Sequence, residues 1–356
     1  MANVVTLPTA QPSPILNGVD LAKPLPPIPW VCERLELAPG AVNIWAGYGY
    51  SGKTLAAQEL LISVAAGKLV WGHIACRTGA VMHLDYEQGR RLTSERYQRL
   101  CRSTGVDLGE LGDRIRAVPF PPVYLDTAAG LKWLEQICAG VTLCVVDSLR
   151  AALPTVDENA SDVRKYLDPI ARISEATQCT FILIHHGRKR GERDHGAAQS
   201  VRGSSAIFDA CQSVCVFDGK RGEPSTVSLE KARITGSAVA DVSLVFEDVS
   251  GPSPEFDGRD DPKWGLRVKM QGKPPANGLS DVKAAIMETV RTKPGLSKRA
   301  VVSETTGRAP VLWDVLEDLI EAGALRAVAR TGRGGGLAVF LPAPDDGISE
   351  EVAWDN

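Results

Sequence analysis

The chain has 356 residues, 44% of them hydrophobic and 23% charged, with a formal net charge of −3 at pH 7. This length suffices for one large and one small globular domain. The slightly acidic balance excludes a protein that coats nucleic acid over its whole surface. The eight cysteines form no CxxC pair or zinc-spaced cluster, which favours free thiols in a reducing compartment. No apolar run reaches the ~18 residues of a membrane helix, and no signal peptide is evident. We therefore expect a cytoplasmic protein with no membrane partner.

Short apolar runs alternate with helical stretches between residues 29 and 250. Runs typical of strands buried on both faces occupy residues 41–47, 80–86, 141–147, 180–186 and 213–218. Helical spacing covers residues 53–66, 89–103, 128–138 and 161–177. The alternation predicts a three-layer α/β domain. A hairpin of residues 226–234 and 241–248 is expected to close this domain.

The remaining segments differ in composition from this domain. Residues 1–28 are a Pro-rich arm, which we expect to be extended and which either reaches a neighbouring subunit or is a disordered leader. Residues 251–278 are rich in Gly, Pro and Asp and are interpreted as a linker. Residues 279–342 show three helical stretches and then two strands around a Gly-rich turn, which predicts a winged-helix domain. Residues 343–356 form an acidic tail.

The segment from residue 47 to residue 54, GYGYSGKT, has the spacing of a phosphate-binding loop. An apolar run precedes it and a helix-forming stretch follows it, as such a loop requires. The backbone N–H groups of the loop and the helix N-terminus favour phosphate oxygens. The sequence therefore predicts an ATP site, whose binding residues are Gly47, Gly49, Ser51, Gly52, Lys53, Thr54 and Leu55.

The chemistry of this loop also predicts a metal site. Lys53 supplies charge to the β- and γ-phosphates, and the Thr54 hydroxyl can ligate Mg²⁺. An acidic residue at the end of a strand must complete the metal shell. Asp147 ends the apolar run VTLCVVD and fits this role.

The motifs taken together resemble a known group. The phosphate loop is followed in order by LDYE, VVDS, ILIHH, RGSSAIFDA and EKAR. This series resembles the RepA-type hexameric replicative helicases, ATPases of the RecA/DnaB-like superfamily, over residues 28–250. The resemblance implies a RecA-like three-layer P-loop core. It also implies that Glu87 orients the attacking water, with Asp85 behind it, and that His186 senses the γ-phosphate.

The resemblance further implies two loops that contact DNA. The first would span residues 151–161 and the second residues 187–201. With Arg202, the second loop carries Arg188, Lys189, Arg190 and Arg193 against two acidic residues. Such a basic loop suits contacts to the phosphates of single-stranded DNA, which are largely independent of base sequence.

Lys231 and Arg233 in EKAR match the motif that related helicases insert into the ATP site of a neighbouring subunit. Cations of this kind stabilise charge on the transferred phosphate. The resemblance therefore implies a homo-oligomer, most simply a hexameric ring. One departure leaves the inserted residue open, because Gln212 stands near a position where the RepA type has an arginine.

The helix expected at residues 310–322 limits the function of the winged helix. Winged helices often place their third helix in the DNA major groove. Here Val311, Leu312, Val315, Leu316, Leu319 and Ile320 form the apolar stripe, and the opposite face carries Asp314, Glu317, Asp318 and Glu321. Four carboxylates would repel phosphate, so we expect a protein-contact module, for a replication protein or another subunit.

Three functions fit these observations. The first is a ring-shaped, ATP-dependent single-stranded-DNA translocase or helicase that replicates a plasmid, phage or other mobile element. The second is a RecA-like recombination or annealing ATPase that forms filaments. The third is a regulatory module that uses ATP as a switch and binds a protein partner through the winged helix.

Overall fold

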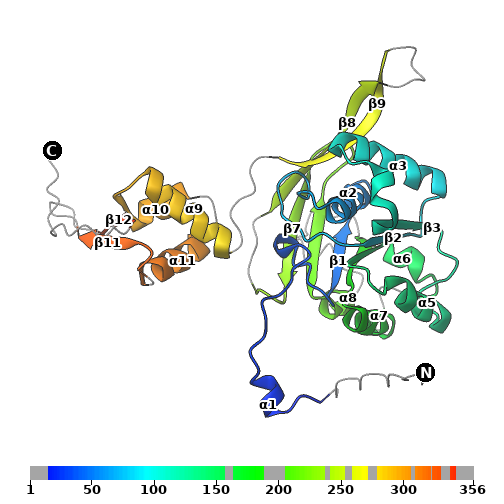
Figure 1. The fold of residues 1–356 in the computed structure, drawn as a ribbon, viewed down its shortest axis with the longest axis horizontal. Helices are drawn as coiled ribbons and strands as arrows, with labels where there is room; N and C mark the ends of the chain where they lie inside the picture. The colour runs from blue at the N-terminus through cyan, green and yellow to red at the C-terminus, as the bar shows by residue number, and fades with distance from the viewer. Residues whose placement is uncertain are drawn as a thin grey trace, which may run out of the picture.

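The computed structural model describes residues 15–156, 163–187, 205–236, 241–252, 259–271, 279–305, 309–321, 323–329 and 337–341. Within these ranges, the chain forms a large α/β domain and a smaller domain with its own apolar core (Figure 1). In the same ranges, every helix is too short or too polar to cross a membrane.

The large domain is built on one sheet with the strand order β3-β2-β4-β5-β1-β6-β7-β8-β9. Strands β3 to β6 in this order are parallel, and β7, β8 and β9 continue the sheet antiparallel. The five predicted strands are confirmed as β1 (Val42–Gly47), β2 (Val81–Asp85), β4 (Leu143–Asp147), β5 (Thr180–His186) and β6 (Ser213–Asp218). The predicted hairpin is formed by β7 (Ser225–Ala232) and β8 (Val242–Pro252).

Helices cover both faces of the parallel strands, which confirms the three-layer prediction (Figure 1). One face packs against α2 (Lys53–Ala66) and α3 (Arg90–Thr104). The other packs against α5 (Ala128–Cys138), α6 (Leu149–Ala152), α7 (Arg164–Thr177) and α8 (Ser205–Ala210). Along β1, Trp45 faces the first layer while Ile44 and Ala46 face the second, as the alternation of side chains in a strand requires. Short elements complete the domain, namely α4 (Leu108–Leu111) and the 3₁₀ helices Glu33–Leu35 and Gly112–Arg114.

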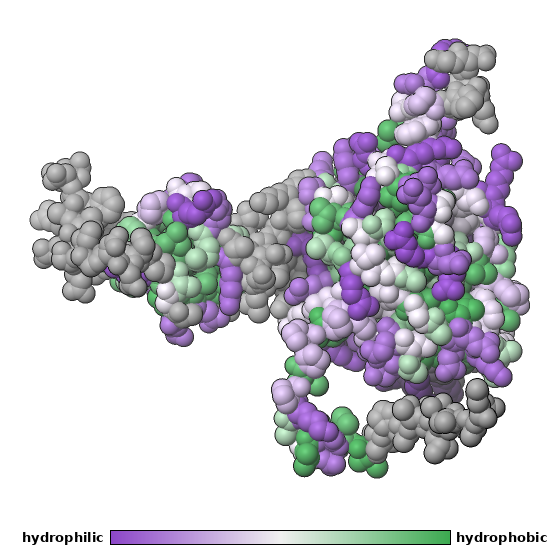
Figure 2. Space-filling model, viewed as in Figure 1, coloured by the Kyte–Doolittle hydropathy of each residue, from purple (hydrophilic) through white to green (hydrophobic). Residues whose placement is uncertain are grey.

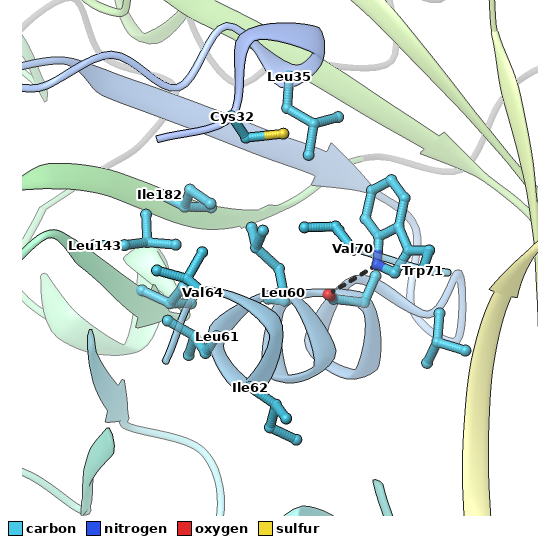
Figure 3. Packing of buried hydrophobic residues seen from close by; sticks show 14 of the residues in the cluster. Cys32, Leu35, Leu60, Leu61, Ile62, Val64, Val70, Trp71, Leu143 and Ile182 are labelled. Atoms are coloured by element: carbon cyan, nitrogen blue, oxygen red, sulfur yellow. Dashed lines mark hydrogen bonds between the residues drawn. The ribbon is translucent and has the colours of Figure 1, made fainter. Parts of the chain in front are cut away.

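Helix α2, which follows the phosphate loop, is held firmly in the core (Figure 3). Its side chains Leu60 and Leu61 are completely buried. The Trp71 side chain packs beside it, and its indole N–H donates to the Ala56 carbonyl at 3.2 Å. Gly67 ends the helix in a left-handed conformation with φ +67°. The start of α2 is therefore fixed relative to the sheet.

Two strands of the large sheet lie outside the predicted set. Strand β3 (Ile115–Pro119) is only partly buried at the sheet edge, so it lacks the continuous apolar run that marks the central strands. Strand β9 (Asp260–Met270) pairs with β8 inside the range predicted to be a linker, residues 251–278, and that part of the prediction is wrong. Its apolar side chains alternate as in a half-buried edge strand, where Pro262 is tolerated. The β8–β9 hairpin extends beyond α3 (Figure 1).

The smaller domain contains the predicted helices as α9 (Leu279–Thr292), α10 (Lys298–Glu304) and α11 (Ala309–Glu321). The predicted strands are β11 (Arg326–Ala329) and β12 (Leu337–Phe340), and a short strand, β10 (Leu296–Ser297), also pairs with β12. Leu312, Val315, Leu316 and Leu319 of the predicted stripe are buried, whereas Ile320 is partly buried. The side chains of Val311 and Asp314, and the tail at residues 343–356, lie outside the described part.

The described part of the N-terminal arm is not wholly extended, because it contains the short helix α1 (Gly18–Leu21). Asn17 and Asp20 form a capping box that supports this turn. Apolar side chains of the arm are largely exposed, among them Leu16, Val19, Leu21 and Leu25. Figure 2 shows this hydrophobic surface apart from the body of the domain.

Glu59 of α2 provides a test of the core. Its carboxylate is buried, accepts from the Trp71 backbone N–H at 3.0 Å and from Ser63 Oγ at 3.1 Å, and burial raises its pKa to about 7. Because the pKa is higher in the folded state than in the unfolded state, ionisation of Glu59 lowers stability as the pH rises from about 4.5 to about 7. Glu59→Gln removes this cost.

We therefore expect the difference in unfolding free energy between Glu59→Gln and the wild type to shift in favour of the variant as the pH rises over this range. The shift should be on the order of 3 kcal/mol. Urea unfolding of both proteins at pH 4.5, 6 and 8 measures the difference. A difference that stays constant with pH would contradict the assigned cause.

Candidate active site

The phosphate loop joins the carboxyl end of β1 to the N-terminus of α2. Gly52 precedes the helix with φ +85°, a conformation that strongly favours glycine. A Cβ atom at this position would lie 2.1 Å from the ring of Phe246 in β8, and a Cβ atom at Gly47 would lie 2.4 Å from the Phe217 carbonyl oxygen. The two fixed glycines of the motif are therefore required by close packing as well as by the loop conformation.

The Lys53 ammonium group is buried inside this loop. It donates to the Gly47 carbonyl at 2.7 Å, the Tyr48 carbonyl at 2.9 Å and Ser51 Oγ at 3.3 Å. Burial lowers the pKa of Lys53 to about 8, and the carboxylates of Asp147 and Glu87 oppose this shift. With a phosphate bound, the ammonium group could donate to charged phosphate oxygens in place of these neutral carbonyls. Charged acceptors bind ammonium more strongly.

Asp147 at the end of β4 lies beside Thr54. Thr54 Oγ1 donates to Asp147 Oδ2 at 2.7 Å. Asp147 Oδ1 is buried and has no hydrogen-bond partner in the described part of the chain. Burial raises the pKa of Asp147 to about 6, and the bond from Thr54 opposes the rise. A nearby cation would therefore stabilise the ionised form of this carboxylate.

This donor set fits Mg²⁺ carried in with a nucleotide. Magnesium is commonly held by one or two protein oxygens together with substrate phosphates, and Thr54 and Asp147 supply such oxygens. Among the described residues, no group of three or more His, Cys, Asp or Glu side chains could hold a metal ion alone. When bound, Mg²⁺ would offset the negative charge of the β- and γ-phosphates.

Glu87 follows β2 and is held by side chains from two neighbouring strands. Ser148 Oγ donates to Glu87 Oε1, and His186 Nε2 lies 3.0 Å from the same oxygen. The bond with His186 is the largest cause that holds the pKa of Glu87 below its ordinary value. The carboxylate is therefore ionised at neutral pH, as a residue that orients or deprotonates water must be.

Asp85 fixes the turn that carries Glu87. Its carboxylate accepts from the backbone N–H groups of Glu87 at 3.2 Å and Gln88 at 2.8 Å, and from Thr93 Oγ1 at 2.8 Å. Asp85 is completely buried. These contacts place Asp85 behind the turn that carries Glu87.

The other predicted nucleotide-binding residues serve the loop in different ways. Ser51 is buried and accepts from Lys53. Leu55 is partly buried against the apolar core beneath α2. A Cβ atom at Gly49 would meet nothing within 4 Å, so the structure gives no packing reason for this glycine. Five of the predicted site residues lie together at the carboxyl edge of the sheet, namely Lys53, Thr54, Asp147, Glu87 and His186.

Lys231 and Arg233 lie away from the phosphate loop. Lys231 pairs with Val214 in the sheet, whereas Gly47 of the phosphate loop is level with Phe217. Val214 and Phe217 are three residues apart in β6, which corresponds to about 10 Å along the strand. Gln212 accepts from the Val42 N–H through its side chain at 3.1 Å, so its contact is with the start of β1.

The predicted DNA-contacting residues Arg188, Lys189, Arg190, Arg193 and Arg202 lie outside the described residues. The first predicted loop is described as far as residue 156. The roles of these residues stay predictions.

Two contributors to the site were absent from the sequence prediction. Ser148 is one, and its place directly after Asp147 is a signal that could have found it. The second is His83 of β2, which is buried, with Nε2 4.0 Å from Asp147 Oδ2 and Nδ1 3.2 Å from the Tyr97 hydroxyl. Burial lowers the pKa of His83 to about 4, so the ring is neutral at pH 7. Its place within an apolar run gave no signal of this contact.

A glycine-rich loop after a central parallel strand, a lysine and a threonine at the helix start, and a strand-end aspartate beside them define a P-loop nucleotide-binding protein. The family model described as an AAA domain matches residues 8–192, more than half of the chain. The chain therefore belongs to this family of P-loop ATPases.

Comparison with solved structures finds a similarity to the crystal structure of the RadB recombinase. The sequence identity is 18% and the TM-score 0.44, with 58% of this chain and 88% of that chain covered. A search of curated proteins gave no match.

Glu87→Gln tests the site most simply, because it keeps the shape of the side chain and removes its charge. We expect ATP turnover to fall by about 10²- to 10⁴-fold, the range for loss of an acid–base group. Nucleotide affinity should change little, since the phosphate loop is intact. Single-turnover hydrolysis and titration with a fluorescent ATP analogue measure the two quantities. Glu110→Gln, at an exposed acid in α4, is the control, and equal turnover in both variants would contradict the assignment.

Proposed function

We propose that this ATPase works as a ring, most simply a hexamer, that moves along single-stranded DNA, and that Lys231 and Arg233 of one subunit complete the ATP site of the next. The observation that carries the proposal is the position of these two cations. Lys231 stands on β7 and Arg233 directly after it, with its N–H donating to the Gln212 carbonyl, so both are about 10 Å or more from the phosphate-loop level of the sheet. Their charge is therefore available to a neighbouring subunit and not to the site of their own chain.

Contacts within the subunit support a link between these cations and DNA. Arg233 Nη2 donates to the Asp209 carbonyl at 2.9 Å, and Lys231 Nζ donates to the Phe208 carbonyl. The Lys231 ammonium also lies 4.9 Å from the centre of the Phe208 ring. Phe208 and Asp209 belong to α8, which follows the predicted second DNA loop. A shift of that loop on DNA would move α8 and, with it, the two cations.

The N-terminal arm supports assembly of several subunits. Its exposed apolar side chains are unusual for a free surface, with Leu25 91% and Val19 74% exposed. The proline-rich stretch before Trp30 favours an extended chain, and its residues are exposed. Burial of these side chains on a second copy would remove apolar surface from water. We therefore include the arm in the proposed subunit contact.

Within this proposal, the biological role is that of a helicase in the replication of a plasmid, phage or other mobile element. A recombination or annealing ATPase with the same core remains the second candidate, and it would form open filaments instead of closed rings. A nucleotide-switched regulatory module is the third. Native mass together with ATPase rates with and without oligo-dT separates the three, since the regulatory module would be indifferent to DNA.

The smaller domain is proposed to be a winged helix that contacts protein and not the DNA major groove. Its α11 carries Asp318 and Glu321 on exposed positions. Glu317 of the predicted acidic face is paired with Lys298 of α10 at 2.7 Å, so one basic residue near this helix is already neutralised. The face that a recognition helix would offer to phosphate is therefore acidic.

A complementation experiment tests the shared ATP site. Lys53→Ala loses its own phosphate-binding lysine but keeps Lys231 and Arg233, whereas Arg233→Ala has the opposite defect. Each variant alone should lose DNA-stimulated ATPase, by about 10³-fold or more if Arg233 acts as a trans cation. Mixed in equal amounts, they should regain activity at about a quarter of the sites, because neighbours in a ring combine at random.

Lys220→Ala is the control for that experiment, since Lys220 is an exposed cation in the turn after β6. It should be active alone and need no complementation. A mixture of the two defective variants that stays inactive, while native mass shows mixed rings, would refute the shared site.

Replacement of the four acids of α11, Asp314, Glu317, Asp318 and Glu321, by Ser tests the smaller domain. Binding of the protein to a labelled DNA duplex should change less than twofold, because the helix does not enter the groove under this proposal. Fluorescence anisotropy at fixed salt measures it. A large gain in affinity would show that these acids face DNA and repel it.

A further inference from the structure

Four aromatic side chains are more than half exposed in the described ranges, namely Tyr48, Tyr50, Phe120 and Tyr124. All four follow strands at the carboxyl edge of the sheet, the first two after β1 and the last two after β3. They form two pairs, because β2, β4 and β5 lie between β3 and β1 in the sheet. Exposed aromatic rings are costly to leave in water, which indicates a ligand or partner. Tyr48 and Tyr50 belong to the phosphate loop, whereas Phe120 and Tyr124 have no function in the site described above.

Phe120 and Tyr124 stand on a short loop that is fixed at both ends. The Phe120 N–H donates to the Asp85 carbonyl at 2.7 Å, and its φ of +49° turns the chain sharply after β3. The Tyr124 ring stacks on Tyr86, with centroids 6.4 Å apart and planes inclined by 24°. The Tyr86 hydroxyl donates to the Val123 carbonyl at 3.0 Å. The two exposed rings are therefore held in place and lose little conformational freedom on binding.

The same loop is tied to the start of the first predicted DNA loop. The Leu125 N–H donates to the Ala152 carbonyl at 2.9 Å. Asp126 accepts from the backbone N–H of Thr155 at 3.0 Å and from its hydroxyl at 2.6 Å. The rings of Phe120 and Tyr124 thus belong to the surface from which that loop departs.

Exposed arginines are close in sequence to residues that this loop contacts. The Phe120 ring lies over Gly89, since a Cβ atom there would be 3.4 Å from it, and the exposed Arg90 and Arg91 follow directly. Exposed Arg150 of α6 stands two residues before Ala152, and its guanidinium donates to the Val156 carbonyl. Exposed rings with arginines in the adjoining segments suit a single strand, whose bases stack on aromatic faces and whose phosphates attract cations.

We infer that Phe120 and Tyr124 form a platform on which bases of single-stranded DNA stack, while the nearby arginines contact its phosphates. This inference rests on the proposed function and names a contact surface for the same DNA. The surface meets the ATP site through the hydrogen bond between Phe120 and Asp85, the residue that holds the turn of Glu87. Stacking on the platform is thereby joined to the strand that carries the catalytic carboxylate.

The test is the affinity of the full-length protein for fluorescein-labelled oligo-dT, measured by anisotropy over a series of salt concentrations. Phe120→Ala and Tyr124→Ala should each weaken binding about 5- to 150-fold, the range for loss of one stacked base. The slope of log Kd against log salt should not change, because no phosphate contact is lost. Arg91→Ala should instead reduce that slope by about one.

Conservative variants separate stacking from other causes. Tyr124→Phe and Phe120→Tyr keep a ring and should bind as the wild type does. Phe120→Leu keeps apolar area without a ring and should bind as weakly as Phe120→Ala. ATPase activity without DNA should be unchanged in all of these variants, which also shows that they are folded.

Three results would overturn the inference. In the first, wild type binds oligo-dT and the alanine variants bind it equally well. In the second, the alanine variants lose native mass while their assembled fraction binds DNA normally, which would make the platform a subunit contact. In the third, wild type itself does not bind single-stranded DNA, in which case the proposed function fails as well.

Discussion

The buried ammonium group of Lys53 constrains the whole large domain. It must lie in a low-dielectric loop to act strongly on phosphate, yet burial there lowers its pKa to about 8. The carbonyls of Gly47 and Tyr48 hold it by hydrogen bonds, and the carboxylates of Asp147 and Glu87 favour its charged form. The loop, the central strand and the two acidic strand ends therefore depend on one another. Loss of the Asp147 carboxylate, the larger of these two influences, would therefore favour the neutral form of Lys53.

The sheet order explains how residues distant in sequence meet at this group. Strands β2, β4, β5 and β1 are neighbours, and all end at the same edge because they are parallel. Glu87, Asp147 and His186 therefore converge with the phosphate loop without long connecting loops. The same geometry leaves Lys231, on an antiparallel strand, at another level of the sheet. A site that needs further positive charge must obtain it from another subunit under the proposed function.

Much of this arrangement could be predicted from the sequence, because buried parallel strands and the phosphate loop have strong local signals. The ends of β2, β4 and β5 follow from apolar runs that stop at Asp85, Asp147 and His186. Strand β9 was missed because its alternation stands among Gly, Pro and Asp residues. The contact of His83 with Asp147 depends on the pairing of β2 with β4, which no local pattern specifies. The contacts of Lys231 and Arg233 with α8 join residues far apart in the sequence, so no local pattern predicts them either.

Under the proposed function, the phosphate loop hydrolyses ATP efficiently only when a neighbouring subunit supplies cations. The most direct measurement is ATP turnover per subunit over a wide range of protein concentration, with saturating oligo-dT and native mass recorded on the same samples. Turnover should be low for the dissociated subunit and should rise in step with the assembled fraction. Turnover per subunit that stays constant while the protein passes from monomer to assembly would contradict it.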